Sequence, residues 1–303
     1  MAANVTPEPR RPLPVRDGVA PSYLWLPEGR WEHLLAFLVQ RFPDVPCATW
    51  RSRMARGEVV DGMGAVLGPD SALRRGMRIW YYRELERETP IPFEAQILFR
   101  DAHLLVLDKP HFLPTIPGGR FLHETLLVRL KKSLRLDDLT PIHRLDRETA
   151  GVVIFSHQLA SRGAYQSLFQ QRGVEKEYEA LAAPLPGVQF PFVYRSKMVE
   201  GTPFFRMREV AGEPNSETEI DVIEHRADAT LYRLRPRTGR KHQLRVHLAA
   251  LGIPIVNDAF YPVALPCKQD DVSRPLQLLA RAIAFADPYT GQRRHFESLR
   301  ALR

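Results

Sequence analysis

The sequence contains, in its last third, a basic segment that reads Arg237-Thr238-Gly239-Arg240-Lys241-His242-Gln243-Leu244-Arg245-Val246-His247. An apolar segment follows, Leu251-Gly252-Ile253-Pro254-Ile255-Val256-Asn257-Asp258, with Tyr261 shortly after it. From Ala229 to Asn257 there is no acidic residue, whereas six arginine or lysine residues fall in that range. Because a guanidinium can bind phosphate with two hydrogen bonds and stack on bases, this stretch predicts a surface for a polyanion.

The composition of the whole chain points the same way. Its 43 Lys and Arg residues against 35 Asp and Glu give a formal net charge of +8 at pH 7. Such a balance favours a nucleic-acid partner over an anionic membrane. No apolar run approaches the ~18 residues of a membrane-spanning helix, and the N-terminus is polar and proline-rich. We expect a cytosolic protein in which Cys47 and Cys267 are ordinary thiols, without a disulfide framework or a zinc site.

A second segment carries a candidate catalytic carboxylate. It reads His143-Arg144-Leu145-Asp146-Arg147-Glu148-Thr149-Ala150-Gly151 and precedes an apolar strand, so we expect a loop at a sheet edge. Asp146 lies between two arginines, and nearby cations favour the ionised form of a carboxyl group. An ionised carboxylate suits a nucleophile or a base. Taken alone, however, such a residue is more often a structural partner in a salt bridge.

The spacing of the remaining polar residues excludes several other sites. A kinase catalytic loop has His-Arg-Asp without the inserted Leu145, and no glycine-rich phosphate loop lies upstream. No P-loop and no dinucleotide-binding glycine motif occurs. His242 and His247 are five residues apart, not the four that place two ligands on one helical face, so we expect no metal.

Apolar periodicity predicts an α+β domain over residues 89–303, with a mixed, largely antiparallel sheet flanked by helices. The predicted strands cover residues 97–99, 104–107, 152–155, 177–182, 218–222 and 230–235, and the predicted helices cover residues 122–134 and 159–171. The strands occur in runs without strict alternation with helices, which disfavours a purely parallel sheet.

The N-terminal part of the chain predicts a smaller, separate unit. Residues 1–22 are proline-rich and we expect them to be disordered. Residues 23–88 then read as two short helices followed by strands near 56–62 and 75–81, with a linker at residues 84–94. This pattern resembles the S-four-like RNA-binding module, and the resemblance implies that Arg51 and Arg53 on the second helix contact RNA. A structural domain with solvated arginines is the alternative.

Together, the three segments His143–Asp146, Lys176–Tyr178 and Arg237–His247 resemble the RluA-type pseudouridine synthase family in order and spacing. The resemblance covers about residues 96–285, and Leu107-Asp108-Lys109-Pro110 agrees with it. It implies an enzyme that isomerises uridine in structured RNA, ribosomal or transfer. The reaction exchanges no electrons or atoms overall, so it implies neither a cofactor nor a metal. We expect a monomer without an obligate protein partner.

The resemblance also implies a role for each matching residue. Asp146 matches the essential aspartate, Tyr178 the tyrosine that packs against the target base and assists its deprotonation, and Arg245 the arginine that pairs with the aspartate and holds it ionised. Arg144 matches the arginine that reaches toward the flipped nucleotide. Lys176, Arg240 and His242 are further candidates for RNA contact, although histidines in such a segment are often structural.

Two positions depart from the family pattern. Asn257 stands where members often have glycine, and Leu279 where they often have histidine. The first change is expected to alter a turn, and the second to remove a histidine from the pocket wall. A non-catalytic RNA-binding or ribosome-assembly factor is the main competing hypothesis, and the intact Asp146, Tyr178 and Arg245 argue against it. A hydrolase is disfavoured because no nucleophile elbow or carboxylate pair occurs. The sequence leaves open which uridine is modified.

Overall fold

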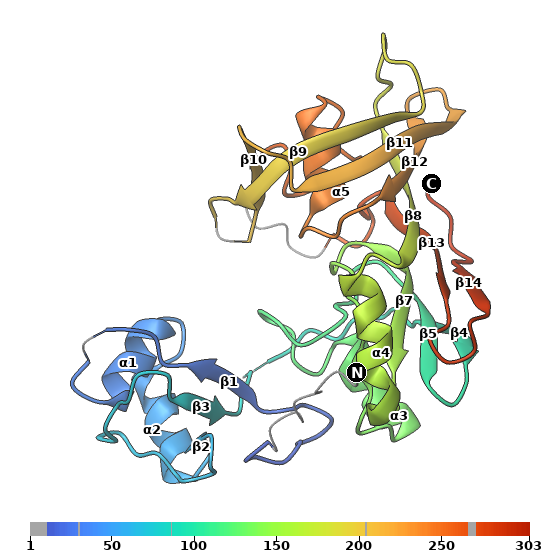
Figure 1. The fold of residues 1–303 in the computed structure, drawn as a ribbon. Helices are drawn as coiled ribbons and strands as arrows, with labels where there is room; N and C mark the ends of the chain where they lie inside the picture. The colour runs from blue at the N-terminus through green and yellow to red at the C-terminus, as the bar shows by residue number, and fades with distance from the viewer. Residues whose placement is uncertain (1–10, 30, 86, 204, 266–270) are drawn as a thin grey trace. The chain divides into compact units, whose positions relative to one another are not determined.

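The computed structural model of the protein describes residues 11–29, 31–85, 87–203, 205–265 and 271–303 (Figure 1). The chain divides into two compact units, Met1–Thr89 with Pro117–His123, and Pro90–Ile116 with Glu124–Arg303. The division at Thr89 falls within the predicted linker. The return of residues 117–123 to the first unit was not predicted. Cys47 is a free, exposed thiol, whereas Cys267 lies outside the described residues.

The first unit packs two helices against a small antiparallel sheet. The helices are α1 (Leu34–Arg41) and α2 (Cys47–Ala55), and the strands are β1 (Ser22–Trp25), β2 (Val59–Asp61) and β3 (Arg78–Tyr81) in the order β1-β3-β2. Leu34, Leu38, Trp50 and Ile79 are fully buried between them. Both helices were predicted, whereas β1 was not. The likeness to an S-four-like module stays a prediction.

Residues 11–22 correct one expectation, because they are packed rather than disordered. Leu13 and Val19 are buried, and Leu13 joins a cluster with Val60 and Trp80. The hydroxyl of Tyr82 donates to the carbonyl of Pro14 at 2.7 Å. Arg16 and Val19 also pair through two backbone hydrogen bonds across a turn. Residues 1–10 of the predicted tail lie outside the described residues.

Within the described part of the second unit, the strands form one 11-stranded sheet. Nine follow the order β10-β9-β11-β12-β8-β13-β7-β5-β4, while β14 pairs with β13 and β6 with β7. The strands are β4 (Gln96–Arg100), β5 (Leu104–Lys109), β6 (Thr140–Pro141), β7 (Ala150–Ser156), β8 (Val174–Ala182), β9 (Phe192–Glu200), β10 (Met207–Val210), β11 (Ser216–His225), β12 (Thr230–Pro236), β13 (Leu278–Ala286) and β14 (Arg293–Glu297). Among these strands only β13 and β7 pair in parallel, so the predicted mixed, largely antiparallel sheet is confirmed.

Three helices flank this sheet: α3 (Leu126–Leu134), α4 (Leu159–Gln170) and α5 (Gln243–Ala250). The prediction for α3 began four residues too early. Thr125 ends the preceding loop, and its side chain accepts from the backbone N–H of Val128, as an N-cap does. Leu244 and Leu248 of α5 belong to a core cluster with Ile220 and Tyr232 of the sheet, which fixes the position of the basic segment.

The two halves of the sheet, β10 to β13 and β7 to β4 in the strand order above, meet where β7 begins, immediately after the loop that carries Asp146. Leu279 and Ala280 of β13 pair there with Ala150 and Gly151 of β7. Gly151 has a φ of +112°, and a Cβ atom at this position would lie 2.2 Å from the carbonyl oxygen of Ala280. Only glycine permits both this backbone conformation and this approach.

Gly151→Ala is therefore expected to destabilise the protein by at least about 2 kcal/mol, because the backbone must leave its conformation or break the β7–β13 pairing. Gly163→Ala is the matched control. Gly163 lies in α4 with nothing within 4 Å of an added Cβ, so alanine there is expected to stabilise by roughly 0.5–1 kcal/mol. Urea unfolding of the two variants measures both effects, and equal midpoints would contradict the role of Gly151.

Candidate active site

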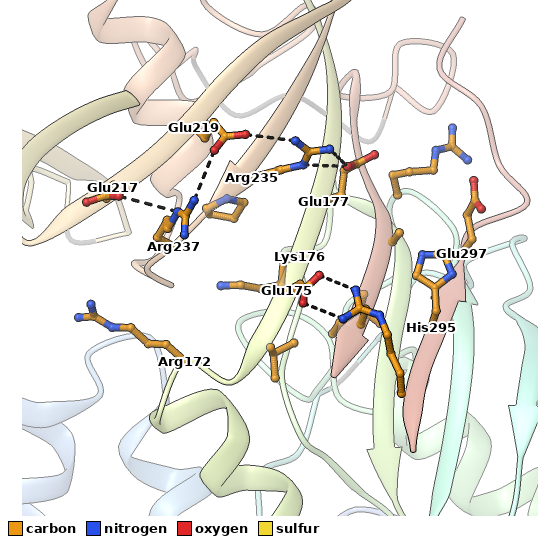
Figure 2. A pocket seen from close by; sticks show the side chains of 17 residues that line it. Arg172, Glu175, Lys176, Glu177, Glu217, Glu219, Arg235, Arg237, His295 and Glu297 are labelled. Carbon is orange, nitrogen blue, oxygen red and sulfur yellow. Dashed lines mark hydrogen bonds and ion pairs between the residues drawn. The ribbon is translucent and has the colours of Figure 1, made fainter. Parts of the chain in front are cut away.

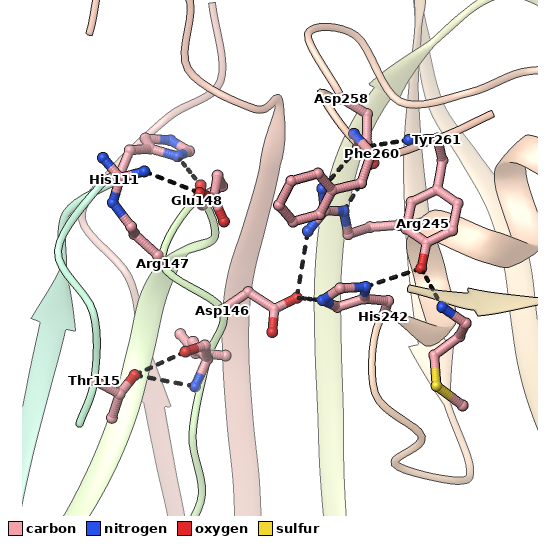
Figure 3. A network of polar contacts seen from close by, with 12 residues as sticks. His111, Thr115, Asp146, Arg147, Glu148, His242, Arg245, Asp258, Phe260 and Tyr261 are labelled. Atoms are coloured by element: carbon pink, nitrogen blue, oxygen red, sulfur yellow. Dashed lines mark hydrogen bonds and ion pairs between the residues drawn. The ribbon is translucent and has the colours of Figure 1, made fainter. Parts of the chain in front are cut away.

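The loop that carries Asp146 is clamped at several backbone positions (Figure 3). The hydroxyl of Thr115 donates to the carbonyl of Leu145 at 2.8 Å and accepts from its N–H at 3.2 Å. The backbone N–H of Thr149 donates to the carbonyl of Asp146 at 3.2 Å and closes a turn. Leu145 itself is buried. These contacts fix the backbone on both sides of the carboxylate.

A buried lysine forms hydrogen bonds with the backbone of the same loop and of the residues after β5. The ammonium of Lys109, at the end of β5, donates to the carbonyls of Pro110, Leu113 and Arg147 at 3.0, 2.8 and 3.2 Å. Burial lowers the pKa of Lys109 to about 7, against the opposing charges of Glu148 and Asp146. All three acceptors are backbone carbonyls, and the one from Arg147 connects the end of β5 to the loop that carries Asp146.

His143, the first residue of the predicted motif, is structural. Its Nε2 accepts from the backbone N–H of Ile154 at 3.2 Å, and its ring stacks on Phe169 at 4.8 Å. Burial, with the nearby charge of Lys176, lowers the pKa of His143 to about 3. The ring is therefore neutral at pH 7 and accepts a hydrogen bond, as this geometry requires.

Asp146 opens into a cavity of about 540 Å³. Its side chain is 26% exposed. The wall opposite comes from Tyr178 of β8, Leu278 of β13, the loop of residues 238–242, and Arg245 of α5. The structure thus brings together the predicted residues Asp146, Tyr178, Arg245, Arg144, Lys176, Arg240 and His242 around one cavity.

Arg245 is fixed chiefly by a residue that sequence reasoning gave no role. Its Nε and Nη2 donate to the two carboxylate oxygens of Asp258 at 2.8 and 2.6 Å, whereas its Nη1 lies 3.6 Å from Asp146 Oδ2. Arg245 and Asp258 are each 1% exposed. Burial opposes the charge, but Asp258 and then Asp146 raise the pKa of Arg245 above its ordinary value. Nη1 has no hydrogen-bond partner among the described residues and faces the cavity side of Asp146.

The expectation that both flanking arginines support Asp146 is wrong for Arg147. Its Nε donates to the carbonyl of Phe112 at 3.1 Å, and its Nη1 pairs with Glu148 at 3.2 Å. Arg144 is exposed on the cavity rim, and its side chain makes no hydrogen bond or ion pair with any residue that the structure describes. The cation that faces the carboxylate comes instead from α5, almost 100 residues further along the chain.

His242 lies beside Asp146 rather than at the RNA-facing rim. Its Nε2 is 3.6 Å from Asp146 Oδ2, and its Nδ1 is 2.9 Å from the hydroxyl of Tyr261. That hydroxyl accepts from the backbone N–H of Met207 at 2.8 Å, and its own proton is available to Nδ1. In the tautomer whose Nδ1 accepts from Tyr261, the proton of a neutral His242 is on Nε2, the ring nitrogen that faces Asp146 (Figure 3). Burial lowers the pKa of His242 to about 4, although Asp146 opposes this, so the ring is neutral at pH 7.

The contacts of His242 with Tyr261 and Asp146 predict the behaviour of two His242 variants. His242→Phe is expected to lower kcat about tenfold or more, because a donor to a charged group is lost. His242→Gln should retain most of the rate, since an amide can accept from Tyr261 and donate to Asp146. Because the pKa of His242 is about 4, a plot of wild-type kcat against pH should show no change due to protonation of His242 between pH 5.5 and 8. A step near pH 6.5 that disappears in His242→Gln would contradict the neutral ring.

Tyr178 is placed against the cavity with its phenol protonated. Burial raises its pKa above the ordinary value, and the negative charge of Asp146 adds to this shift. The ring is partly accessible from the cavity. Tyr178 is therefore available for packing and as an O–H donor, whereas a tyrosinate is disfavoured near neutral pH.

The predicted phosphate contacts form the cavity rim. Lys176 donates to the carbonyl of Thr238 at 3.1 Å, and burial, with Arg172, lowers its pKa to about 8. Arg240 is exposed, with its Nε on the carbonyl of Asn215 at 3.1 Å. Gln243, which the sequence did not single out, shapes this loop: its Oε1 accepts from Thr238 and from the backbone of Arg240.

The structure separates the two arginines of α2. Arg51 is exposed, whereas the side chain of Arg53 is 4% exposed, lies over Trp50 and pairs with Glu84 at 3.4 Å. Arg53 therefore has no free surface for RNA, and that expectation is corrected. Arg51→Ala alone is expected to weaken RNA binding. It should also lower by about one the salt slope, which is the slope of the logarithm of the binding constant against the logarithm of the salt concentration. An unchanged slope in binding titrations over a range of salt would count against the first unit as an RNA reader.

The structure explains one family departure and corrects the account of the other. Asn257 has a φ of +64°, a region that glycine and asparagine tolerate best, and its Nδ2 donates to the carbonyl of Pro275 at 3.0 Å. The turn is therefore retained. Leu279 is fully buried with Leu181 and Leu231, so this position is in the core and not on the wall; its neighbour Leu278 lines the cavity.

A larger cavity of about 810 Å³ lies along the sheet and lacks the chemistry of the Asp146 site (Figure 2). Glu175 and Glu177 line it from β8, and Lys176 between them lines both this cavity and the Asp146 cavity. Arg235 pairs there with Glu177 and Glu219, each at about 3 Å. Because its charges are largely paired with one another, the smaller cavity is the better candidate for the active site.

Comparison with known proteins identifies the class of enzyme. Residues 103–250 match the family of RNA pseudouridylate synthases. The dual-specificity RNA pseudouridine synthase RluA of Salmonella typhimurium is 32% identical over 210 residues, covering 66% of this chain and 91% of that protein. Human pseudouridylate synthase RPUSD2 is 30% identical over 244 residues, 77% of this chain but 43% of that protein. A solved human structure, RNA pseudouridylate synthase domain containing 4, superposes with a TM-score of 0.53 at 27% identity, covering 68% and 88% of the two chains.

The chain is therefore an RNA pseudouridine synthase. It belongs to the RluA-type family, as its motifs predicted. The predicted fold is confirmed by the same comparisons for the catalytic unit. No helix in the described ranges is long and apolar enough to cross a membrane.

Proposed function

We propose that this protein converts uridine to pseudouridine in structured RNA, ribosomal or transfer, with Asp146 as its catalytic carboxylate. The observation that carries the proposal is the environment of Asp146. Its carboxylate opens into the 540 Å³ cavity and faces two buried donors, Arg245 Nη1 and His242 Nε2, each 3.6 Å away. Tyr178 lines the same cavity.

The reaction needs a bound uridine to lose the bond between its N1 and the ribose C1′. The base then turns and joins C1′ through C5; C5 gives up its proton to a base or to water and N1 takes up one, so the reaction is an isomerisation with no net change of atoms. An ionised carboxylate serves this sequence either by attack on the sugar or by removal of a ribose proton. Both routes start from the ionised carboxylate, and the neighbouring cation and donor favour that form.

The surrounding residues support base flipping and RNA binding. Removing a uridine from its stack costs a few kcal/mol, and least in a loop. The aromatic ring of Tyr178 can pack on the flipped base, and the exposed Arg144 and Arg240 at the rim can bind neighbouring phosphates. These features favour catalysis over a purely RNA-binding or assembly function, which would not require a cavity carboxylate that faces Arg245 and His242. We propose a monomeric cytosolic enzyme, without a metal or cofactor.

Mapping pseudouridine in cellular RNA tests this function. Total RNA would be compared from cells with the wild-type protein, with Asp146→Asn, and without the protein. Sites present only with the wild type identify the substrate RNA and support the catalytic role. Sites that persist in Asp146→Asn but vanish without the protein would overturn that role.

A further inference from the structure

The three-stranded sheet of the first unit has two different faces. Leu24 of β1 packs with Leu26, Ile79 and Tyr81 against the helices. The alternate residues Tyr23 and Trp25 point the other way and remain 53% and 54% exposed. Their cross-strand partners are Trp80 and Arg78, so all four side chains share one face. Large aromatic rings this exposed on a regular strand are not required by the core.

Arg78 links the exposed rings into one surface. Its guanidinium carbon lies 4.2 Å from the ring centroid of Trp25 and 5.0 Å from that of Tyr23. Tyr23 also contacts Trp80, with ring centroids 4.8 Å apart. Arg78 makes no salt bridge or side-chain hydrogen bond with any residue that the structure describes, and its Nε is buried without a partner. Its charge is therefore uncompensated beside the two rings.

We propose that Tyr23, Trp25 and Arg78 form a stacking site for unpaired RNA bases, in addition to the Asp146 cavity. The face of the Trp25 ring that Arg78 does not cover can stack on a base, and the guanidinium of Arg78 can bind the adjoining phosphate. Stacking of this kind accepts any base and requires a single strand, because bases within a duplex already stack on each other. The site would hold an unpaired segment beside the structured target.

Charge favours RNA over a protein as the occupant. The central polar group of the patch is a cation without a carboxylate partner in the described residues, and the whole chain carries +8. The inference rests on the proposed function in one respect, namely that the substrate is RNA. It does not depend on which residue performs the chemistry, so the two can be tested apart.

The test measures binding by the full chain carrying Asp146→Asn, which removes turnover. The probes are a short unstructured RNA and a duplex that contains the same strand. Tyr23→Ala with Trp25→Ala is expected to weaken binding of the single strand about tenfold or more, with little effect on the duplex. Its salt slope should be unchanged, whereas Arg78→Ala should lower the slope by about one.

Two controls separate stacking from loss of structure. Met63→Ala with Val66→Ala removes exposed apolar groups of the same unit and should not change affinity. Trp25→Phe should retain most of the affinity, because a ring remains. Trp25 is the most exposed tryptophan of the described residues, so the single strand should quench tryptophan fluorescence in the Asp146→Asn protein but not when Trp25→Phe is added.

Equal affinities of the aromatic double variant and its Met63/Val66 control for the single strand would overturn the stacking site. An equal loss for single strand and duplex, or a change in oligomeric state on removing the rings, would overturn it in favour of a general or a protein contact. If neither RNA bound any variant, the RNA-directed function itself would fail. If RNA bound independently of the rings, only the stacking site would fail.

Discussion

The purified Asp146→Asn protein is expected to form pseudouridine about 10³-fold more slowly than the wild type, or not measurably. Asparagine keeps the shape of the side chain and can still lie beside Arg245. It can neither attack the sugar nor accept a proton, so the chemical step fails. Single-turnover assays with chemical labelling of pseudouridine measure this rate.

The loss should be confined to chemistry. Arg245 keeps its main partner Asp258, so Asp146→Asn leaves no buried charge unpaired. Thermal unfolding and RNA affinity are therefore expected to match the wild type. Asp138→Asn, an exposed carboxylate shortly before the same loop, is the matched control and should keep full activity. Comparable rates for the Asp146 and Asp138 variants would refute Asp146 as the catalytic group.

Asp258→Ala should cost about 3–5 kcal/mol of stability, because it leaves the buried guanidinium of Arg245 without its partner. The same change should lower kcat, since Arg245 loses the two hydrogen bonds that aim Nη1 at Asp146. Urea unfolding and single-turnover rates measure the two effects. Glu175→Gln, which breaks an exposed pair with Arg293, should change neither.

A double variant separates stability from catalysis. Arg245→Met with Asp258→Asn removes both buried charges, while the asparagine oxygen can still accept from the N–H groups of Phe260 and Tyr261. It should therefore be more stable than Asp258→Ala yet remain inactive. An active double variant would show that Arg245 is dispensable for the reaction.

The sequence predicted those parts of the fold that carry a clean apolar pattern. The strands β5 and β7 are buried along their whole length, and residues 104–107 and 152–155 within them are continuous apolar runs. By contrast, β13 reads Leu-Leu-Ala-Arg-Ala-Ile-Ala-Phe-Ala, and its leucines and alanines favour a helix until the neighbouring strands override them. The β9–β10 hairpin is half exposed and polar, so its pattern is weak.

The site was predictable in its members but not in its pairings. Family motifs placed Asp146, Tyr178 and Arg245 together, whereas adjacency in sequence wrongly made Arg147 a neighbour of the carboxylate. The partner of Arg245 comes from a turn 13 residues further on, and no spacing rule connects a helix to such a turn. Tyr261 likewise gains its role only through the backbone of Met207 on another strand.

The division of the cavity between the two halves of the sheet has a consequence during synthesis. Asp146 is followed along the chain by Tyr178, Arg245, Asp258 and finally Leu278 of β13, whose neighbours pair with β7. At ribosomal rates the interval between Asp146 and Leu278 lasts on the order of ten seconds. Until Arg245 and β13 have been synthesised, the carboxylate of Asp146 lacks the guanidinium that faces it and the cavity wall that Leu278 supplies.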